Sequence, residues 1–421
     1  MEKYVLKGGV RLEGSVEISG AKNAAVAILP AVIMSDSPCI LENVPDISDV
    51  KIILQIMESI GVKINRIDSH TIEIDAANVK TCNISSELSR SMRASYYFLG
   101  VLLTRFGEAH VSLPGGCNLG ARPINQHLKA FEELGCSTNV DYGMVNVLCG
   151  GGMSGAQIFF DTVSVGSTIN AILASVKAKG QTVLENVAKE PHIVDLANFL
   201  NSMGADIRGA GTDVIKINGV SFLGGTRYSI IPDQIEAGTY MAAAVATGGN
   251  VLIKNVTPKH LESIVSRLER AGATVEEYED ALRIMRNGEI QSTNIKTMPH
   301  PGFPTDMQSQ MTVVLSLADG TSIVTEDIWD NRFKYVDELK RMGAKIQVDG
   351  KAAIVEGVDK LFGAKVKATD LRAGAAMIIA GLAAEGTTEI EDIFHIERGY
   401  ENVVEKFRGL GAQIEKVEIP N

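Results

Sequence analysis

"ELKRMGAKIQVDGKAAIVEG" (338–357) contains the pattern that decides the fold. The first half predicts an amphipathic helix that ends at Gly343, because glycine adopts the positive-φ conformation of a helix C-terminus without steric cost. The alternating residues after it predict two strands joined by a turn. The helix-ending phrase recurs as "LQIMESIGVKI", "FEELGCSTNV", "FLNSMGADI", "RLERAGATV" and "KFRGLGAQI", and its glycines are Gly61, Gly135, Gly204, Gly272, Gly343 and Gly411. The chain therefore consists of six copies of one repeat.

A second phrase recurs in every repeat, where a strand leads into a helix that is apolar on nearly all sides. Examples are "SGAKNAAVAILP" (19–30), "SVGSTINAILAS" (164–175) and "TDLRAGAAMIIAGLAA" (369–384). A helix that is apolar all round is expected to be buried. Each repeat then reads strand–helix–strand–strand–helix–strand, in which βαβ crossovers place helices against parallel strands. The predicted fold class is α/β.

The ends of the chain predict how the repeats are divided between domains. The sixth repeat stops at "GAQIEKVEIPN" (411–421), before its second hairpin strand and its buried helix, and residues 1–21 have the rhythm of the missing parts. We therefore expect a middle domain of three repeats, residues 22–231, and a discontinuous domain of three repeats, residues 1–21 and 232–421. The chain would cross between them twice, and ligand sites are common at such junctions.

Composition excludes several classes of protein. The chain has 421 residues, of which 45% are hydrophobic and 22% charged, as in an ordinary globular protein. A net charge of −11 disfavours nucleic acid as a partner. No apolar run reaches the roughly 18 residues of a membrane span, and the N-terminus lacks the pattern of a signal peptide. Five cysteines without a CxxC pair indicate neither a disulfide framework nor a zinc site, so a cytoplasmic location is expected.

One cysteine stands in an unusual context, "LPGGCNLGARP" (113–123). The glycines on both sides of Cys117 predict a loop that can close over a substrate. Arg122 follows five residues later, and a positive charge favours the thiolate form of cysteine. The other cysteines fit buried structural positions better: Cys39, Cys82, Cys136 and Cys149.

Several specific motifs along the whole chain resemble those of the enolpyruvyl transferases. They are "SGAKNA" (19–24), "MRAS" (92–95), "PGGCNLGARP" (114–123), "SVGST" (164–168), "PTDMQ" (304–308), "WDNRF" (329–333), "TDLRA" (369–373) and "HIERGY" (395–400). The resemblance implies two inside-out α/β domains, with helices inside and sheets outside. "SGAKNA" and the cysteine loop favour the family members that act on a nucleotide-sugar, UDP-N-acetylglucosamine, with phosphoenolpyruvate as the second substrate. That reaction releases phosphate and is the first committed step of peptidoglycan synthesis, and so serves cell-wall biogenesis, cell shape and cell division.

The resemblance also implies roles for individual residues. Lys22, Arg122 and Arg398 match positions that hold phosphoenolpyruvate, with Asn23 beside Lys22. Arg93 matches a position that contacts the nucleotide-sugar, and we place Arg372 in the same site because an arginine at a helix N-terminus needs a reason beyond the helix itself. The uridine end is expected to rest on Arg122, Pro123, Ile124, Asn125, Gln126, Ser164, Val165, Gly166 and Ile328. Asn125 and Thr162 depart from the family, which often has Asp and sometimes Lys at these positions.

Two further residues are expected to carry the chemistry, together with Lys22 and Arg398. Cys117 matches the family cysteine that donates a proton, forms a covalent adduct and is alkylated by the antibiotic fosfomycin; the sequence does not apportion the first two roles. Asp306 matches the base next to the sugar 3′-hydroxyl. On sequence alone an aspartate just before an apolar helix would be its N-cap. Because both roles use the same oxygens, we predict that Thr305 caps the helix.

Other functions remain open at this stage. One is the sister activity on shikimate 3-phosphate, another is a non-catalytic paralogue that only binds a nucleotide-sugar, and a third is a sixfold-repeat clamp protein, which the acidic charge disfavours. His127, His300 and His395 show no metal-ligand spacing, so we expect structural roles for them. No metal and no organic cofactor is implied, and protein partners and oligomeric state are not predicted.

Overall fold

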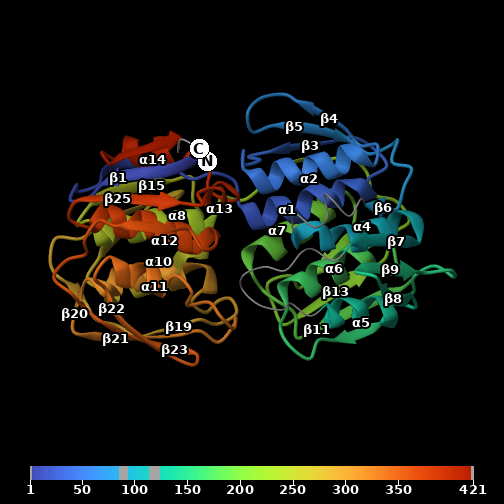
Figure 1. Ribbon diagram of the computed structural model, residues 1–421. Coiled ribbons are helices and arrows are strands. Elements are labelled where there is room, and N and C mark those ends of the chain that lie inside the picture. Colours follow the sequence, from blue (N-terminus) through green and yellow to red (C-terminus); the bar gives the residue numbers. More distant parts are fainter. Residues whose placement is uncertain (1, 85–92, 113–123, 419–421) are drawn as a thin grey trace. The chain divides into compact units, whose positions relative to one another are not determined.

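The computed structural model describes residues 2–84, 93–112 and 124–418 (Figure 1). These residues form two compact units. The terminal unit consists of residues 2–19 and 232–418, and the middle unit of residues 20–84, 93–112 and 124–231. The boundaries fall between Ser19 and Gly20 and between Ile231 and Pro232. No helix in the described ranges is both long enough and apolar enough to cross a membrane.

The middle unit contains these elements in chain order: α1 (Lys22–Ala31), η1 (Val32–Met34), β3 (Cys39–Glu42), α2 (Ser48–Ser59), β4 (Lys63–Arg66), β5 (Ile72–Asp75), β6 (Asn83–Ile84), η2 (Arg93–Tyr96), α4 (Tyr97–Phe106), β7 (Glu108–Ser112), α5 (Asn125–Glu133), β8 (Ser137–Asp141), β9 (Met144–Leu148), β10 (Gln157–Phe159), α6 (Val165–Ser175), β11 (Gln181–Glu185), α7 (Pro191–Ser202), β12 (Asp206–Arg208), β13 (Val214–Asn218) and β14 (Arg227–Ser229).

The terminal unit contains β1 (Glu2–Lys7), β2 (Glu13–Glu17), α8 (Gln234–Ala246), β15 (Asn250–Lys254), η3 (Pro258–Leu261), α9 (Glu262–Arg270), β16 (Thr274–Glu277), β17 (Ala281–Met285), β18 (Ile290–Gln291), β19 (Ile295–Lys296), η4 (Thr305–Met307), α10 (Gln308–Ser316), β20 (Ala318–Asp319), β21 (Thr321–Thr325), α11 (Val336–Arg341), β22 (Lys345–Asp349), β23 (Ala352–Glu356), β24 (Lys365–Lys367), α12 (Leu371–Ala383), β25 (Thr387–Glu391), α13 (Phe394–Glu397), α14 (Val403–Gly409) and β26 (Gln413–Glu418).

The sixfold repeat appears as four-stranded sheets of one topology. In each sheet an outer strand runs parallel to its neighbour, and two antiparallel strands complete the sheet. The strand orders in the middle unit are β14-β3-β5-β4, β6-β7-β9-β8 and β10-β11-β13-β12. Those in the terminal unit are β2-β15-β17-β16, β19-β21-β23-β22 and β24-β25-β1-β26, with a small additional sheet β18-β20.

The apolar helices lie in the interior of each unit, as the sequence predicts. Every residue of α10 is buried, as is every residue of α8 from Ile235 to Ala246. Strands such as β13 alternate buried and more exposed residues, so each sheet has one face on the core and one face toward solvent. Figure 1 shows α8, α10 and α12 between the sheets of their unit. The inside-out α/β fold class is therefore confirmed.

The predicted helix-ending glycines are also confirmed. All six have positive φ, between 90° and 104°. A second repeated feature follows strands β3, β11 and β15. There Asn43, Asn186 and Asn255 adopt the left-handed conformation. Their side-chain amides donate hydrogen bonds to the carbonyls of Ile230, Phe160 and Ile18, at distances of 2.7–2.8 Å, and so bind the end of the parallel outer strand.

Where the chain passes between units, each of two outer strands belongs to one unit while the helix that follows it belongs to the other. The outer strand β2 precedes α1 in sequence but pairs with β15 in the terminal unit, whereas β14 precedes α8 but pairs with β3 in the middle unit. Strand β1 lies between β25 and β26 and supplies the strand that the sixth repeat lacks. The terminal unit therefore closes around the first residues of the chain.

Because β1 is a central strand, its inward residues should matter for stability. Leu6 is 1% exposed in the core of the terminal unit, whereas the next residue, Lys7, is exposed. We expect Leu6→Ala to lower the free energy of unfolding by about 2–5 kcal/mol. The matched control Lys7→Ala should change it by about 0.5 kcal/mol or less. Chemical denaturation measures both, and equal effects would contradict the central position of β1.

Candidate active site

The predicted site residues lie near the first turns of the buried helices, after the ends of the outer strands. Lys22 begins α1, Val165 begins α6, Asp306 lies in η4 before α10, and Arg372 is the second residue of α12. In α/β sheets, the carboxyl ends of parallel strands are the common place for ligand sites. Cys117, Arg122 and Pro123 lie outside the described residues, and so does the side chain of Arg93, which begins η2.

In the terminal unit, one carboxylate joins two buried guanidinium groups. Arg332 Nη2 lies 2.9 Å from Asp306 Oδ1, and Arg372 Nη2 lies 3.1 Å from Asp306 Oδ2. Both arginine side chains are 4% exposed, whereas Asp306 is 28% exposed. Asp233 also acts on Arg372, so this buried guanidinium is held among carboxylates that keep it charged.

Arg372 is held by several groups at once. The Asp370 side chain accepts hydrogen bonds from the backbone amides of Arg372 and Ala373 and caps α12. Burial alone would lower the pKa of Arg372, but the Asp306 carboxylate raises it above its ordinary value, so the guanidinium stays charged. Its centre lies 5.5 Å from the ring centroid of Tyr400. Within the described part of the chain its Nη1 atom is buried without an acceptor.

The prediction that Thr305 caps the following helix is wrong. Thr305 Oγ1 instead donates a hydrogen bond to Glu326 Oε2 at 2.9 Å, and neither η4 nor α10 has a side-chain cap. A buried carboxylate in the next strand-to-loop junction competes successfully for the hydroxyl. The other half of the expectation holds, because the oxygens of Asp306 bind arginines rather than helix amides.

Glu326 organises the loop that contains Ile328. It is 1% exposed, and Oε1 accepts from Thr297 Oγ1 at 2.8 Å, Ile328 N at 2.9 Å and Trp329 N at 3.1 Å. Together with the bond from Thr305, one buried carboxylate therefore receives four donors. The Glu326 carboxylate therefore holds both Thr305, which precedes Asp306, and Ile328, the predicted uridine contact.

Further polar groups support the backbone of Asp306. Gln310 Nε2 donates to the Asp306 carbonyl at 2.9 Å and lies 3.3 Å from Thr239 Oγ1. The Thr239 and Tyr400 hydroxyls are 2.9 Å apart. Because these side chains come from α8, α10 and the loop after α13, three repeats jointly fix the position of Asp306.

Arg398 lies at the C-terminal end of α13 and is partly buried. Its charge adds to the effect of burial in lowering the pKa of His395. The neighbouring histidine is therefore biased toward its neutral form, which fits the expected structural role rather than that of a second cation.

In the middle unit, Lys22 forms an ion pair with a buried aspartate, Asp49. Its Nζ lies 3.1 Å from Asp49 Oδ2, and the side chains are 15% and 1% exposed. Asn23 follows in the first turn of α1 and is partly buried. A buried aspartate on α2 thus restricts the ammonium group of a predicted phosphoenolpyruvate ligand.

The start of α6 is packed against a buried histidine. The Ser164 hydroxyl oxygen caps the N-terminus of α6 by accepting a hydrogen bond from Ser167 N at 3.3 Å. A Cβ on Gly166 would lie 3.0 Å from His127 Cε1, so a larger residue would require the ring to shift slightly. His127 Nδ1 lies 2.8 Å from Asn170 Nδ2, and burial lowers the pKa of His127 to about 4. The ring is neutral at physiological pH, and because Asn170 donates to Nδ1, its proton is on Nε2.

The predicted uridine contacts on α5 differ in their surroundings. Ile124 precedes the helix and packs against the core, while Asn125 is exposed. Gln126 is bound to Asp161 through both ends of its amide, at 2.9 and 3.2 Å. A ligand contact by the Gln126 side chain would have to replace that pairing.

Sequence reasoning missed several residues that shape the site. Arg332 and Tyr400 lie within the motifs "WDNRF" and "HIERGY", but nothing in the sequence connects them to Asp306. Asp49 and Glu326 carry no local signal at all, because each meets its partner only through tertiary packing. A buried acid beside a motif cation can be recognised only after folding brings the two elements together.

Comparison with known proteins identifies the class. The family model described as EPSP synthase (3-phosphoshikimate 1-carboxyvinyltransferase) matches residues 6–407. The enolpyruvyl transferase NikO from Streptomyces tendae has a TM-score of 0.90 and 26% identity, covering 100% of this chain and 99% of that chain. EPSP synthase from Acinetobacter baumannii, with a TM-score of 0.76 and 18% identity over 99% of this chain and 100% of that chain, shares the fold. The chain belongs to the enolpyruvyl transferase family.

Two curated relatives are similar to this chain over its full length. A protein of Caldanaerobacter subterraneus subsp. tengcongensis named UDP-N-acetylglucosamine 1-carboxyvinyltransferase 3 is 56% identical over 99% of this chain and 100% of its own length. UDP-N-acetylglucosamine 1-carboxyvinyltransferase 2 of Clostridium acetobutylicum is 57% identical over 100% of both chains. The family membership expected from the motifs is therefore confirmed.

The Glu326 network predicts a large stability effect beside a neutral control. Glu326→Ala leaves two backbone amides and two hydroxyls without their acceptor, and we expect the free energy of unfolding to fall by about 3–5 kcal/mol. Asp327 is exposed and forms a surface ion pair with Lys296. Asp327→Ala should cost about 0.5 kcal/mol or less in the same denaturation experiment. A mild effect of Glu326→Ala would show that the loop does not depend on this carboxylate.

Proposed function

We propose that the chain transfers the enolpyruvyl group of phosphoenolpyruvate to the 3′-hydroxyl of UDP-N-acetylglucosamine and releases phosphate. The observation that carries this proposal is the full-length identity of 56–57% to relatives named for that activity. The proposed reaction is the first committed step of peptidoglycan synthesis, and the proposed location is the cytoplasm. The proposed partners of the protein are its two small-molecule substrates, and no nucleic acid is proposed as a partner.

The reaction requires an addition followed by an elimination. The sugar hydroxyl oxygen forms a bond to C2 of phosphoenolpyruvate while its proton goes to a base and C3 gains a proton from an acid. The tetrahedral adduct then loses phosphate and the C3 proton, which restores the double bond. The protein must therefore supply a base, an acid and cations for a phosphate and a carboxylate.

Asp306 is the proposed base. Its partial exposure allows contact with a substrate hydroxyl, while Arg332 and Arg372 fix the orientation of its carboxylate. General bases need such fixed geometry first and a suitable pKa second. Arg372, whose pKa the Asp306 carboxylate raises, is proposed as a charged substrate ligand beside this base.

Lys22, Arg122 and Arg398 are the proposed ligands of phosphoenolpyruvate, with Asn23 beside Lys22. Arginine suits a bidentate grip on carboxylate or phosphate, and lysine a point-charge contact. The buried Asp49 supports this role for Lys22, because it holds the ammonium group in place before the anion binds. Cys117 is proposed both to donate a proton to C3 and to form a covalent adduct with phosphoenolpyruvate, and it is the residue that fosfomycin would alkylate.

The nucleotide end is proposed to bind along α5 and the start of α6, and Arg93 is proposed to contact the nucleotide-sugar. The proposed contacts are Arg122, Pro123, Ile124, Asn125, Gln126, Ser164, Val165, Gly166 and Ile328. The first turn of a helix offers backbone amides to a diphosphate, which supports the proposed contacts at the start of α6.

An acceptor comparison tests the proposed function. Phosphate release from phosphoenolpyruvate is measured with UDP-N-acetylglucosamine and with shikimate 3-phosphate as separate acceptors. We expect release with the nucleotide-sugar alone, because the full-length relatives are named for that acceptor.

The other outcomes have definite meanings. Release with shikimate 3-phosphate would contradict the proposed acceptor and assign the sister activity. Release with neither acceptor, while UDP-N-acetylglucosamine still binds, would contradict catalysis and leave a binding protein. Inactivation of the active chain by fosfomycin, followed by mass mapping of the adduct, places the reactive thiol at Cys117 or elsewhere.

A further inference from the structure

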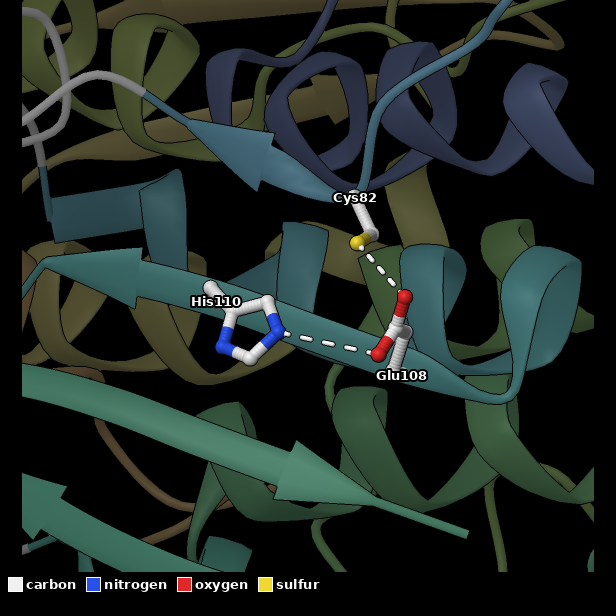
Figure 2. A group of neighbouring side chains, drawn as sticks. All are labelled: Cys82, Glu108 and His110. Atoms are coloured by element: carbon white, nitrogen blue, oxygen red, sulfur yellow. Dashed lines mark hydrogen bonds and ion pairs between the residues drawn. The ribbon is translucent and has the colours of Figure 1, made fainter. Parts of the chain in front are cut away.

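Three metal-ligating side chains that have no role in the proposed reaction gather on one sheet of the middle unit. Cys82 precedes β6, and Glu108 and His110 belong to β7. Their sulfur, carboxylate oxygen and ring nitrogen atoms all lie within 4.8 Å of one another. Figure 2 shows the Glu108 carboxylate between the Cys82 thiol and the His110 ring.

The pairing of two strands brings these side chains together. Glu108 and His110 are two residues apart on β7, so both side chains lie on the same face of the sheet. Ala109 and Val111, on the opposite face, are fully buried in the core. The parallel strand β6 brings Cys82 beside β7, where the Cys82 carbonyl accepts a 3.0 Å hydrogen bond from His110 N.

The ligand atoms lie at distances close to those of a tetrahedral site, and the two shortest distances involve the two different oxygens of Glu108. Cys82 Sγ lies 3.3 Å from Glu108 Oε1, and His110 Nε2 lies 3.8 Å from Glu108 Oε2. Zinc bonds of roughly 2.0–2.3 Å arranged as a tetrahedron place neighbouring ligand atoms roughly 3.3–3.8 Å apart. A metal ion bound to all three residues therefore requires the Glu108 carboxylate to turn until one oxygen faces both Cys82 and His110, or to bind through both of its oxygens.

The outer contact of His110 fixes the ring in the form that binds metals. Its Nδ1 lies 2.7 Å from Asn146 Oδ1, and Asn146 is its direct partner on the neighbouring strand β9. An amide oxygen only accepts, so Nδ1 carries the proton and a neutral ring turns its Nε2 lone pair toward Glu108. Metal-bound histidines are oriented by such a contact at their second nitrogen.

We propose that Cys82, Glu108 and His110 bind one divalent transition-metal ion, of which Zn²⁺ is the best match. Sulfur and imidazole ligands select a borderline metal over Mg²⁺ or Ca²⁺, which prefer oxygen ligands. A thiolate and a carboxylate neutralise the two charges of the ion, and water completes the fourth position.

The cluster does not have the features of a nucleophilic cysteine. The Cys82 thiol donates to Glu108, and burial together with this carboxylate raises its pKa. Without metal the sulfur holds its proton, and metal binding releases it. Because β6 has only two residues, a metal bound to both Cys82 and β7 would strengthen a short strand pairing.

Cobalt titration of the full chain tests the site. Cys117→Ala serves as the background, so that the cysteine assigned to catalysis contributes no thiolate. We expect a near-ultraviolet thiolate-to-cobalt band that saturates at one ion per chain and disappears in Cys82→Ser. His110→Gln and Glu108→Gln should weaken binding at least tenfold, and Asn146→Ala by about 10- to 100-fold. Zn²⁺ should displace Co²⁺ and raise the melting temperature of the background chain.

Cys39→Ala is the control, because it removes a different thiol of the same unit and should leave the band intact. Circular dichroism of each metal-free variant checks folding, and the partly exposed His110 and Glu108 tolerate substitution best. The proposal is overturned by absence of the band, by its persistence in Cys82→Ser, by its loss in Cys39→Ala, or by full affinity in both His110→Gln and Glu108→Gln.

Discussion

The contact of the Asp306 carboxylate with Arg332 and Arg372 is the interaction on which the account of the site depends. Two guanidinium groups that are almost fully buried need a carboxylate nearby, since an unpaired buried charge is strongly destabilising. The same contact fixes the carboxylate that is proposed to act as base. Both the stability of the buried arginines and the proposed reaction therefore require the Asp306 carboxylate. The partial exposure of Asp306 keeps it accessible to a substrate.

The sixfold repeat explains how such residues come together. Each buried helix follows an outer strand, and its first turn lies where that strand ends. Lys22, Val165 and Arg372 occupy this position in three different repeats, and Asp306 lies one turn before a fourth helix. The repeat thus supplies equivalent places for polar residues at the edge of an apolar interior.

Much of the fold could be predicted from sequence, because its determinants are local. The glycine at each helix end and the all-apolar helices predicted the repeats, and the truncated sixth repeat explains why β1 pairs with β25 and β26. Long-range polar contacts could not be predicted in this way. Thr305 was expected to cap a helix and instead binds Glu326, and His110 shows no ligand spacing until the pairing of β6 with β7 brings Cys82 beside it.

The most direct test of the central claim compares Asp306→Asn with the unchanged chain in single-turnover kinetics and in nucleotide-sugar binding. Asparagine keeps the size of the side chain but removes its charge and its basicity. The account predicts that the chemical step slows by about 100- to 10,000-fold, the range for loss of a general base, while the dissociation constant for UDP-N-acetylglucosamine changes only a few-fold. An unchanged chemical step with reduced folding stability would contradict it, and would show that Asp306 serves only to pair the two arginines.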